Sequence, residues 1–496
     1  MFLYIVESGL RNGDTRFAIG TFEFLRVCRR WNEVAIGFPQ LWARWVPGAV
    51  KAWPLFNSRS KDGPLFLTWR PQHLLSARDI LMDPAIPKRI RQLDLTGTSD
   101  QLVHFFGVLN SSPPSNASSI RLHIFPYDSH EPRGHFAQFL SSSFPKLSQL
   151  DLGNFLPNSS SPIFTTSSLT SLKLSLPARK KISYTLSQFA QIIKQHPNLR
   201  ELNLSRGGIP LPGPSSPSIP IVLPRLANLR LYGMDAAILG LIDLIGMSSP
   251  LHDVVIRFGH NPDLTVPALT GTMMKILVAY YDSQGLDRPR KINRLTTSYN
   301  SEKDYLVFDA RSHPAPTSNL KSNLRLQFDG AGALSGDEIV EETFPLFPLE
   351  DVREFSAEGL AICQVGYHGI FQRMRDLSHL RLDRLDIRPV LCALSSGNRG
   401  SSQIVTKATL IHRMSTGEPH QGTVPKLESL TLSHLDIRFG REEQLLDVLK
   451  RRRDHNVGLK KLVVRSCRVH KVEYNPKLGE VVKNVKWDNM QVVVDG

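Results

Sequence analysis

The chain has 496 residues, of which 41% are hydrophobic and 21% are charged, so most of it should fold. This length exceeds one ordinary compact core unless the core is a repeat array. With 60 Lys and Arg residues against 45 Asp and Glu residues, the formal net charge is +15, which favours acidic partners.

The apolar run at 1–6 is followed at once by Glu7, and it is too short for a signal peptide or a transmembrane helix. We therefore expect a soluble protein of the cytoplasm or nucleus that contacts no membrane. The basic run Lys450–Arg453 is more typical of a solvated helix end than of a nuclear-targeting patch. The cysteines are too scattered for a disulfide framework or a metal site; they are Cys28, Cys363, Cys392 and Cys467.

A short helix is predicted over 23–37, because apolar side chains repeat there at helical spacing at Val27, Trp31 and Val34. Pro39 should end it, since the residue before a proline disfavours helical geometry. Two bulky apolar side chains, Leu41 and Trp42, follow the helix directly. Such a module is either a small packed core or a docking face for a partner.

The string RVCRRWNEVAIGFPQLW, residues 26–42, resembles the second half of an F-box, especially as found in large fungal F-box families. In those families a Val-Cys-Arg-Arg-Trp helix is followed shortly by Pro-x-Leu-Trp. Residues 3–7 are similar to the end of the family's first helix, but the family's leading Leu-Pro-x-Glu segment is missing. We therefore expect either a truncated start or a protein that docks weakly or not at all.

F-boxes bind the Skp-type adaptor of cullin-RING ubiquitin ligases, and the resemblance implies the same partner here. It also implies a module core of Val27, Trp31 and Val34. The adaptor-binding positions that it implies are Leu25, Cys28, Trp31, Pro39, Leu41 and Trp42. Trp31 is expected mainly in the core, whereas Trp42 is open between core and interface. Aromatic and aliphatic anchors at the centre of an interface carry most of its binding energy.

From residue 90 onward a Leu-x-x-Leu-x-Leu pattern recurs, often shortly after a proline. Clear copies lie at 147–152, 169–174, 199–204, 226–231, 377–382 and 427–432, and weaker ones at 91–95, 120–124 and 459–464. The middle leucines Leu150, Leu172, Leu202 and Leu229 are spaced by 22, 30 and 27 residues, around the range of leucine-rich repeats. The last two leucines of a copy are two apart, so both point into the core when the copies stack as strands.

The pattern predicts an α/β fold: a small helical module over 1–60, a linker over 61–90 and an irregular leucine-rich repeat solenoid over 91–480. Parallel strands would form its concave face, with helices opposite, for example at 187–195 and 442–450. Pro/Ser-rich loops are expected at 111–119, 156–168 and 208–224. Repeats become degenerate around 255–350, although strands are still expected at 305–308 and 324–328, and 481–496 forms the C-terminal end.

The residue between the last two leucines of each copy should point outward, toward a partner. These positions hold Asp94, His123, Asp151, Lys173, Asn203, Arg230, Arg381 and Thr431. The predicted substrate-binding residues among them are Lys173, Asn203, Arg230 and Arg381. Their positive charges favour a target protein with an acidic or phosphorylated patch.

Catalytic and cofactor motifs are not recognisable in the sequence. Gly330, Gly332 and Gly336 resemble a dinucleotide-binding loop only faintly and are better explained by a turn. Asp383 and Asp386 are expected to be solvated, and Cys28 is expected to be a buried, unreactive thiol. We therefore expect no enzyme activity, no cofactor and no metal.

The function most consistent with these patterns is that of a substrate-recognition adaptor in a Skp–cullin–F-box ubiquitin ligase. The alternative is a non-catalytic repeat scaffold independent of any ligase, whose shortened module caps the first repeat. Nucleic-acid binding would suit the net charge, but it is disfavoured because aromatic residues make up only 8% of the chain.

Overall fold

The structure is a computed structural model of a mixed α/β chain that divides into two compact units, residues 1–250 and 251–496. The first unit is described over 28–45, 53–69, 81–125, 135–142, 144–166, 168–176, 184–206, 209–210, 221–233 and 235–245. The second is described over 251–259, 265–282, 291–312, 322–329, 338, 342–395, 424–438, 440–469, 474–488 and 491–492. Leu25, Val27 and the faint glycine motif at 330–336 lie outside these residues.

Short elements form the N-terminal module: α3 (Arg29–Ile36), α4 (Pro39–Trp42), β1 (Arg44–Trp45) and α5 (Trp53–Ser60). The predicted helix over 23–37 is present from Arg29 and is followed by Gly37. Pro39 begins α4, where its missing N–H leaves no intrahelical hydrogen bond unmade. β1 pairs in parallel with β2 (Leu65–Trp69), which connects the module to the sheet that follows.

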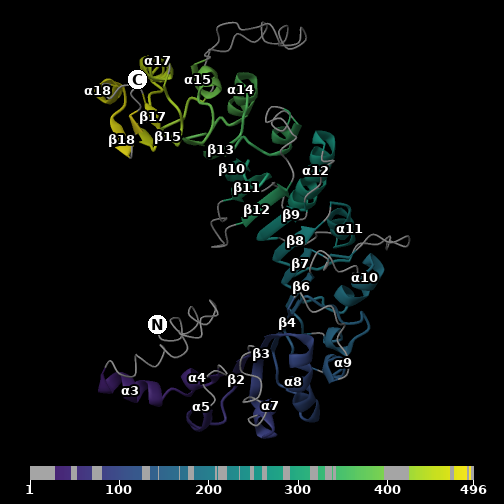
Figure 1. The fold of residues 1–496 in the computed structure, drawn as a ribbon. Helices are drawn as coiled ribbons and strands as arrows, with labels where there is room; N and C mark the ends of the chain where they lie inside the picture. Colours follow the sequence, from purple (N-terminus) through teal and green to yellow (C-terminus); the bar gives the residue numbers. More distant parts are fainter. Residues whose placement is uncertain are drawn as a thin grey trace. The chain divides into compact units, whose positions relative to one another are not determined.

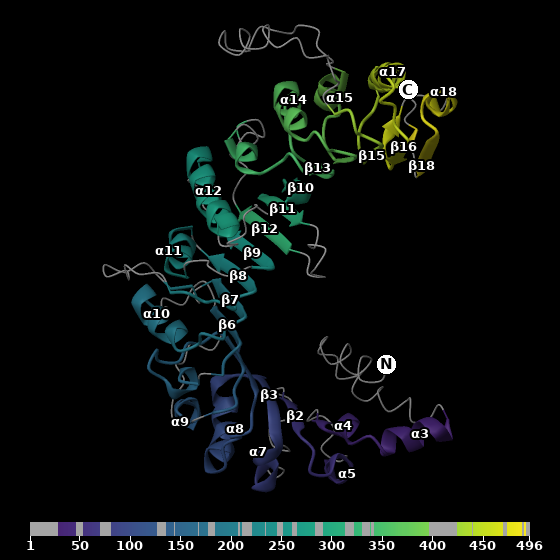
Figure 2. The same ribbon diagram turned by 180° about the vertical axis from the view of Figure 1, so that it is seen from behind.

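The described strands of the first unit form a parallel sheet in chain order. After β2 they are β3 (Ile90–Gly97), β4 (Ser119–Ile124), β5 (Gln149–Gly153), β6 (Ser171–Leu176), β7 (Glu201–Arg206) and β8 (Asn228–Gly233). The helical elements are α7 (Ala85–Arg89), α8 (Ser99–Ser111), α9 (His135–Leu140), η4 (Pro162–Phe164), α10 (Leu186–Lys194) and α11 (Asp235–Ile245). Figures 1 and 2 show α8 to α11 along one face of this sheet, which leaves the other face to the outward-pointing residues.

The leucine pattern explains why these strands pair as they do. The middle leucine of each copy pairs with that of the next, so that Leu150, Leu172, Leu202 and Leu229 form one row across β5 to β8. All four are buried, as are the leucines two positions later. A shift by one residue would turn these leucines to the other face of the sheet, so the pattern also fixes the register. The strands predicted at these copies are therefore confirmed as parallel neighbours.

The second unit begins with β9 (Asp253–Phe258) and α12 (Val266–Asp282). Its other elements are β10 (Ile292–Asn300), β11 (Tyr305–Ser312), β12 (Ser322–Asp329), η6 (Phe344–Leu346), β13 (Glu354–Glu358), α14 (Gln364–Arg373), β14 (His379–Asp383), α15 (Arg388–Ser395), β15 (Ser429–Ser433), α17 (Arg441–Asp454), β16 (Lys461–Arg465), α18 (Tyr474–Val481) and β18 (Asn484–Asp488). A small separate sheet joins β17 (Arg468–Val469) to β19 (Gln491–Val492). β13 to β16 and β18 pair in parallel in chain order, and α14, α15, α17 and α18 lie along one face of them (Figure 1).

An antiparallel insertion distinguishes the second unit from the first. β11 pairs antiparallel with both β10 and β12, whereas β12 pairs in parallel with β9 and β10 in parallel with β13. The sequence predicts only degenerate repeats here, and its strands at 305–308 and 324–328 lie within β11 and β12. Alternating apolar residues indicate a strand but not its direction, so the antiparallel pairing does not follow from the pattern.

Two boundaries differ from the predicted ones. The segment 61–90, predicted as a linker, contains β2, whose alternate side chains Leu65, Leu67 and Trp69 are buried. At the C-terminal end, β18 lies beyond residue 480 and pairs in parallel with β16. The parallel pairing thus reaches further in both directions than the leucine pattern does.

Candidate functional site

Trp42, one of the predicted adaptor-binding residues, is a core residue of the N-terminal module. It is 2% exposed, and its Nε1 donates a hydrogen bond to the Ala35 carbonyl at 2.7 Å. The Phe56 ring meets it edge-on with 5.6 Å between ring centroids, and the Arg59 guanidinium lies 4.3 Å from the centre of its ring. Trp42 was open between a core position and an interface position, and in the structure it packs in the core of the module.

The other predicted adaptor-binding residues have varied surroundings. Pro39 and Leu41 are half-buried, and Cys28, predicted to be buried, is instead exposed just before α3. Leu25 lies outside the described residues, and so does the side chain of Trp31.

Three large apolar side chains near the end of α3 are open to solvent. Val34 is 53% exposed, Ile36 43% and Phe38 36%. Val34 was expected in the module core, but α3 turns Ala35 inward instead, at 1% exposure. Large apolar side chains that are exposed on a small module are typical of an interaction surface. We refer to Val34, Ile36 and Phe38 as the α3 patch.

On the outward face of the first unit, one row of side chains crosses six strands: Asp94, Arg121, Asp151, Lys173, Asn203 and Arg230. The sequence places His123 in this row, but the register puts Arg121 there and His123 in the next row. The His123 ring lies over Gly153, where an added Cβ would meet it at 2.7 Å.

The charges of this row are largely paired within the protein. Arg121 bridges Asp94 and Asp151 at 3.2 and 3.0 Å, and His123 Nε2 lies 3.0 Å from the other oxygen of Asp151. Burial alone would raise the pKa of Asp151, but the hydrogen bonds and charges of His123 and Arg121 hold it below its ordinary value. This end of the row therefore offers a partner little unpaired charge.

Three of the four predicted substrate-binding residues lie on adjacent strands of this row. Lys173, Asn203 and Arg230 pair in register across β6, β7 and β8. Lys173 Nζ forms an ion pair with Glu201 at 2.8 Å. Burial would raise the pKa of Glu201, but this pair, a hydrogen bond from Ser171 and the charge of Arg230 lower it. The fourth residue, Arg381, lies on β14 in the second unit.

A strip of short side chains runs along β15 on the outward face of the second unit. Ser429, Thr431 and Ser433 form it, and Ser433 is buried while the other two are half-buried. Their hydroxyl groups form no hydrogen bond with the residues that the structure describes. We refer to these three residues as the β15 strip.

Basic side chains flank the β15 strip on both sides. The register places His379 and Arg381 of β14 on one side and Lys461 and Arg465 of β16 on the other. Lys486 of β18 lies in the same row as Arg381 and Thr431. The leucine pattern predicts only Arg381 among these residues. Lys461 and Arg465 lie in or just after the weak copy at 459–464, Lys486 lies beyond the predicted repeats, and His379 lies before the middle leucine of its copy.

The basic side chains beside the β15 strip differ in whether they form ion pairs. Lys461, Arg465 and Lys486 are exposed and form no ion pair with any residue in the described part of the chain. Arg381, by contrast, donates to Asp383 at 3.2 Å. His434 Nδ1 lies 3.0 Å from Oδ1 of Asp383, and Arg384 Nε lies 4.0 Å from the same oxygen. The Asp383 carboxylate, expected to be solvated, is instead 7% exposed and surrounded by cations.

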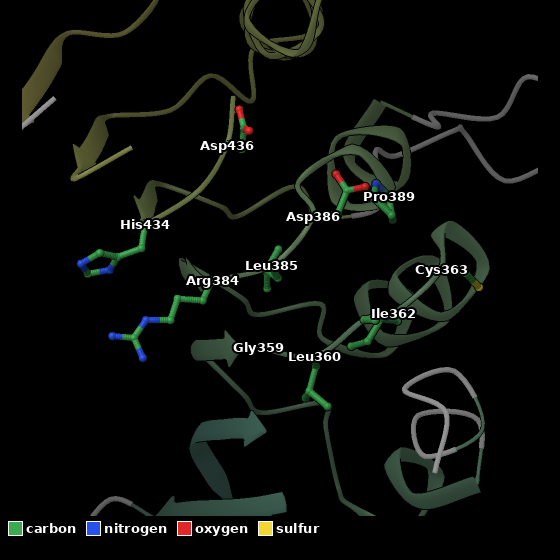
Figure 3. A pocket seen from close by; sticks show the side chains of 11 residues that line it. Gly359, Leu360, Ile362, Cys363, Arg384, Leu385, Asp386, Pro389, His434 and Asp436 are labelled. Atoms are coloured by element: carbon green, nitrogen blue, oxygen red, sulfur yellow. The ribbon is translucent and has the colours of Figure 1, made fainter. Parts of the chain in front are cut away.

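The residues that directly follow β13, β14 and β15 share an unusual backbone conformation. Gly359, Arg384 and His434 have φ values of 68°, 51° and 49°, the left-handed region that is costly for residues other than glycine. Each donates its N–H to the last carbonyl of the next strand, at 3.0, 3.2 and 3.0 Å. Figure 3 shows the side chains of Arg384 and His434 pointing the same way.

Two turns of identical sequence follow β14 and β15. In Leu385–Arg388 and again in Leu435–Arg438, the aspartate accepts the backbone N–H and the guanidinium of the arginine two residues later, with shortest distances of 2.6 and 2.7 Å. The hydrogen bond from Arg388 is the main cause of the lowered pKa of Asp386, and that from Arg438 lowers the pKa of Asp436 to about 2. The string LDIR, present twice, is the sequence signal for this turn.

A groove of about 680 Å³ opens beside these turns. After β13 the chain carries Ala361 and Cys363 where the other two turns carry aspartate and arginine, so no third ion pair fills the space. Apolar residues, Leu360, Ile362 and Leu385, line its middle. Figure 3 shows Arg384 and His434 toward one end and Asp386, Pro389 and Cys363 toward the other. The groove therefore adjoins Asp383 through His434.

The chain matches no protein-family model and no curated protein. Within the described residues, no group of three or more His, Cys, Asp or Glu side chains could hold a metal ion. Among those same residues, no helix has both the length and the apolar character that crossing a membrane requires.

Proposed function

We propose that the chain is a non-catalytic adaptor of a Skp–cullin–F-box ubiquitin ligase, in which leucine-rich repeats form a solenoid that holds a target protein. The observation that carries this proposal is the aligned row of buried leucines from Leu150 to Leu229, with polar residues on the opposite face. Stacked strand-and-helix copies of this kind present a broad surface suited to binding another protein.

The α3 patch supports docking of the N-terminal module to a Skp-type adaptor. Its three apolar side chains lie within the string that resembles an F-box, and they are exposed rather than packed. Apolar side chains of this kind contribute to binding because a partner that covers them removes their surface from water. Trp42 would act indirectly in this proposal, by holding α3 and α4 together.

A pull-down of the full chain on purified Skp-type adaptor tests this proposal. The variant Val34→Glu with Ile36→Glu should lose binding by about tenfold or more, because each change buries a charge in an apolar contact. The matched control is Met274→Glu with Val278→Glu, two side chains of α12 that are 52% and 51% exposed. The control should bind like the wild type. Equal binding by both variants would contradict the proposed docking face.

A second function has its own supporting observation. β1 pairs with β2, and Trp42 packs on Phe56, so the module covers the first strand of the sheet as a cap would. A repeat scaffold independent of any ligase needs such a cap. If the folded wild-type chain fails to bind the Skp-type adaptor, this scaffold function replaces the adaptor function.

A further inference from the structure

We propose that the β15 strip and its cationic flanks bind an extended acidic peptide segment of the target protein. This inference rests on the proposed adaptor function, because it names the surface and the chemistry through which such an adaptor would hold its target. It concerns the second unit alone, where Arg381 is the one predicted substrate-binding residue and Thr431 is a second outward position of the leucine pattern.

Charge is the first reason. Lys461, Arg465 and Lys486 have no anionic partner among the described residues, and all three face the same side of the sheet. The nearby carboxylates are Asp383, which is occupied by Arg381 and His434, and Glu358, which lies 3.6 Å from Arg384. Two further carboxylates lie on this face: Asp488, at the end of β18, is in register with Arg465, and Glu354 of β13 is in register with His379 and lies 3.6 Å from Arg294. Exposed, unpaired cations on one face attract an anionic partner and orient it.

Shape is the second reason. β14 and β16 are two strand spacings apart, about 10 Å, so the short side chains of β15 leave room between the long cationic ones. An extended peptide chain fits a strip of this width. Val463, which lies beside Thr431 on the outward face, is 5% exposed and continues the low floor. The free hydroxyl of Thr431, which is half-buried, can donate a hydrogen bond to a carboxylate or carbonyl oxygen of the peptide.

The same surface fits nucleic acid poorly. The outward residues of β13 to β16 and β18 include no Phe, Tyr or Trp. The two such residues of these strands, Phe355 and Trp487, pair with inward leucine and valine positions. Single-stranded nucleic acid binds mainly by stacking its bases on aromatic rings, in addition to its charge. An acidic peptide needs only the charges and hydrogen bonds that are present.

Fluorescence anisotropy of the purified full chain with a labelled peptide of alternating Glu and Ser, about ten residues long, tests the proposal; this length covers one strand with room at each end. The variant Lys461→Gln with Arg465→Gln and Lys486→Gln should weaken binding by about tenfold or more. The matched control removes the same charge elsewhere in the second unit, with Lys275→Gln, Lys303→Gln and Arg325→Gln, all exposed. The control should stay within about twofold of the wild type, since distant exposed charges are screened.

A second variant separates shape from charge. Thr431→Tyr fills the strip without changing the charge, and it should also weaken peptide binding. Equal losses in the two charge variants would overturn the proposal, because only the net charge would then matter. Absence of binding by the wild type, or tighter binding of an oligo-dT strand than of the peptide, would overturn it as well. The assay contains no Skp-type adaptor, so its failure is distinct from a failure of docking through the α3 patch.

Discussion

His434 Nδ1 lies 3.0 Å from Oδ1 of Asp383, so the residue that follows β15 is held by the last residue of β14. Arg381 donates to the other carboxylate oxygen at 3.2 Å. Asp383→Asn should lower the free energy of unfolding by about 1–2 kcal/mol, because it weakens charged hydrogen bonds whose partners are half exposed. Urea denaturation measures this change. Asp488→Asn, an exposed carboxylate at the end of β18, is the control and should have no effect.

Among the glycines that the structure describes, Gly359 is the position where a side chain is least tolerated. Its φ is +68°, and the backbone carbonyl of Tyr299 occupies the place of a Cβ atom. Gly359→Ala should therefore destabilise the protein by about 2 kcal/mol or more. Gly479→Ala in α18 has open space around it and should instead stabilise the protein by up to about 1 kcal/mol. Thermal unfolding of the two variants would contradict this account if both shifted in the same direction.

Trp42 should act on the stability of the module rather than on direct contact with a partner. Trp42→Ala removes a buried ring and should cost about 3–5 kcal/mol. Trp42→Phe keeps most of the packing on Phe56 and loses the hydrogen bond to the Ala35 carbonyl, so it should cost about 1–2 kcal/mol. Tryptophan fluorescence during denaturation and adaptor binding can be compared in both variants. A Phe variant that folds normally yet loses all binding would show a direct contact instead.

Asp436 should make stability depend on pH in the acid range. Its pKa is lowered from 3.8 to about 2, chiefly by the hydrogen bond from Arg438. A lowered pKa stabilises the folded state above pH 3.8, and this contribution is lost as the pH falls toward 2. Because the carboxylate is partly exposed, we expect about 1 kcal/mol. Asp436→Asn should flatten the acid unfolding curve in this window, whereas Asp447→Asn, exposed on α17, should leave it unchanged.

The sheet could be predicted from the sequence where leucines repeat two residues apart. Leu172 and Leu202 could be assigned to neighbouring strands because the same short pattern contains both. The antiparallel pairing of β11 could not, since the same alternation suits either direction. Likewise, helical spacing groups Val34 with Trp31 but does not show whether a neighbour covers Val34.

The candidate site could be predicted only in part. Arg381 follows from the leucine pattern, but its neighbours Lys461 and Lys486 depend on register between strands that are distant in the sequence. The pairing of Asp383 with His434 joins residues 51 positions apart. The repeated string LDIR could have indicated the two ion-paired turns, because an aspartate two residues before an arginine can accept both its N–H and its guanidinium.

The central claim is that the module docks to a Skp-type adaptor while the sheet stays free for a target. Hydrogen–deuterium exchange of the full chain, with and without purified adaptor, tests it most directly. The account predicts slower exchange at the backbone amides of α3 and α4 and unchanged exchange in β14 to β16. Unchanged exchange in α3 and α4 in the presence of saturating adaptor, or slowing confined to the sheet, would contradict it.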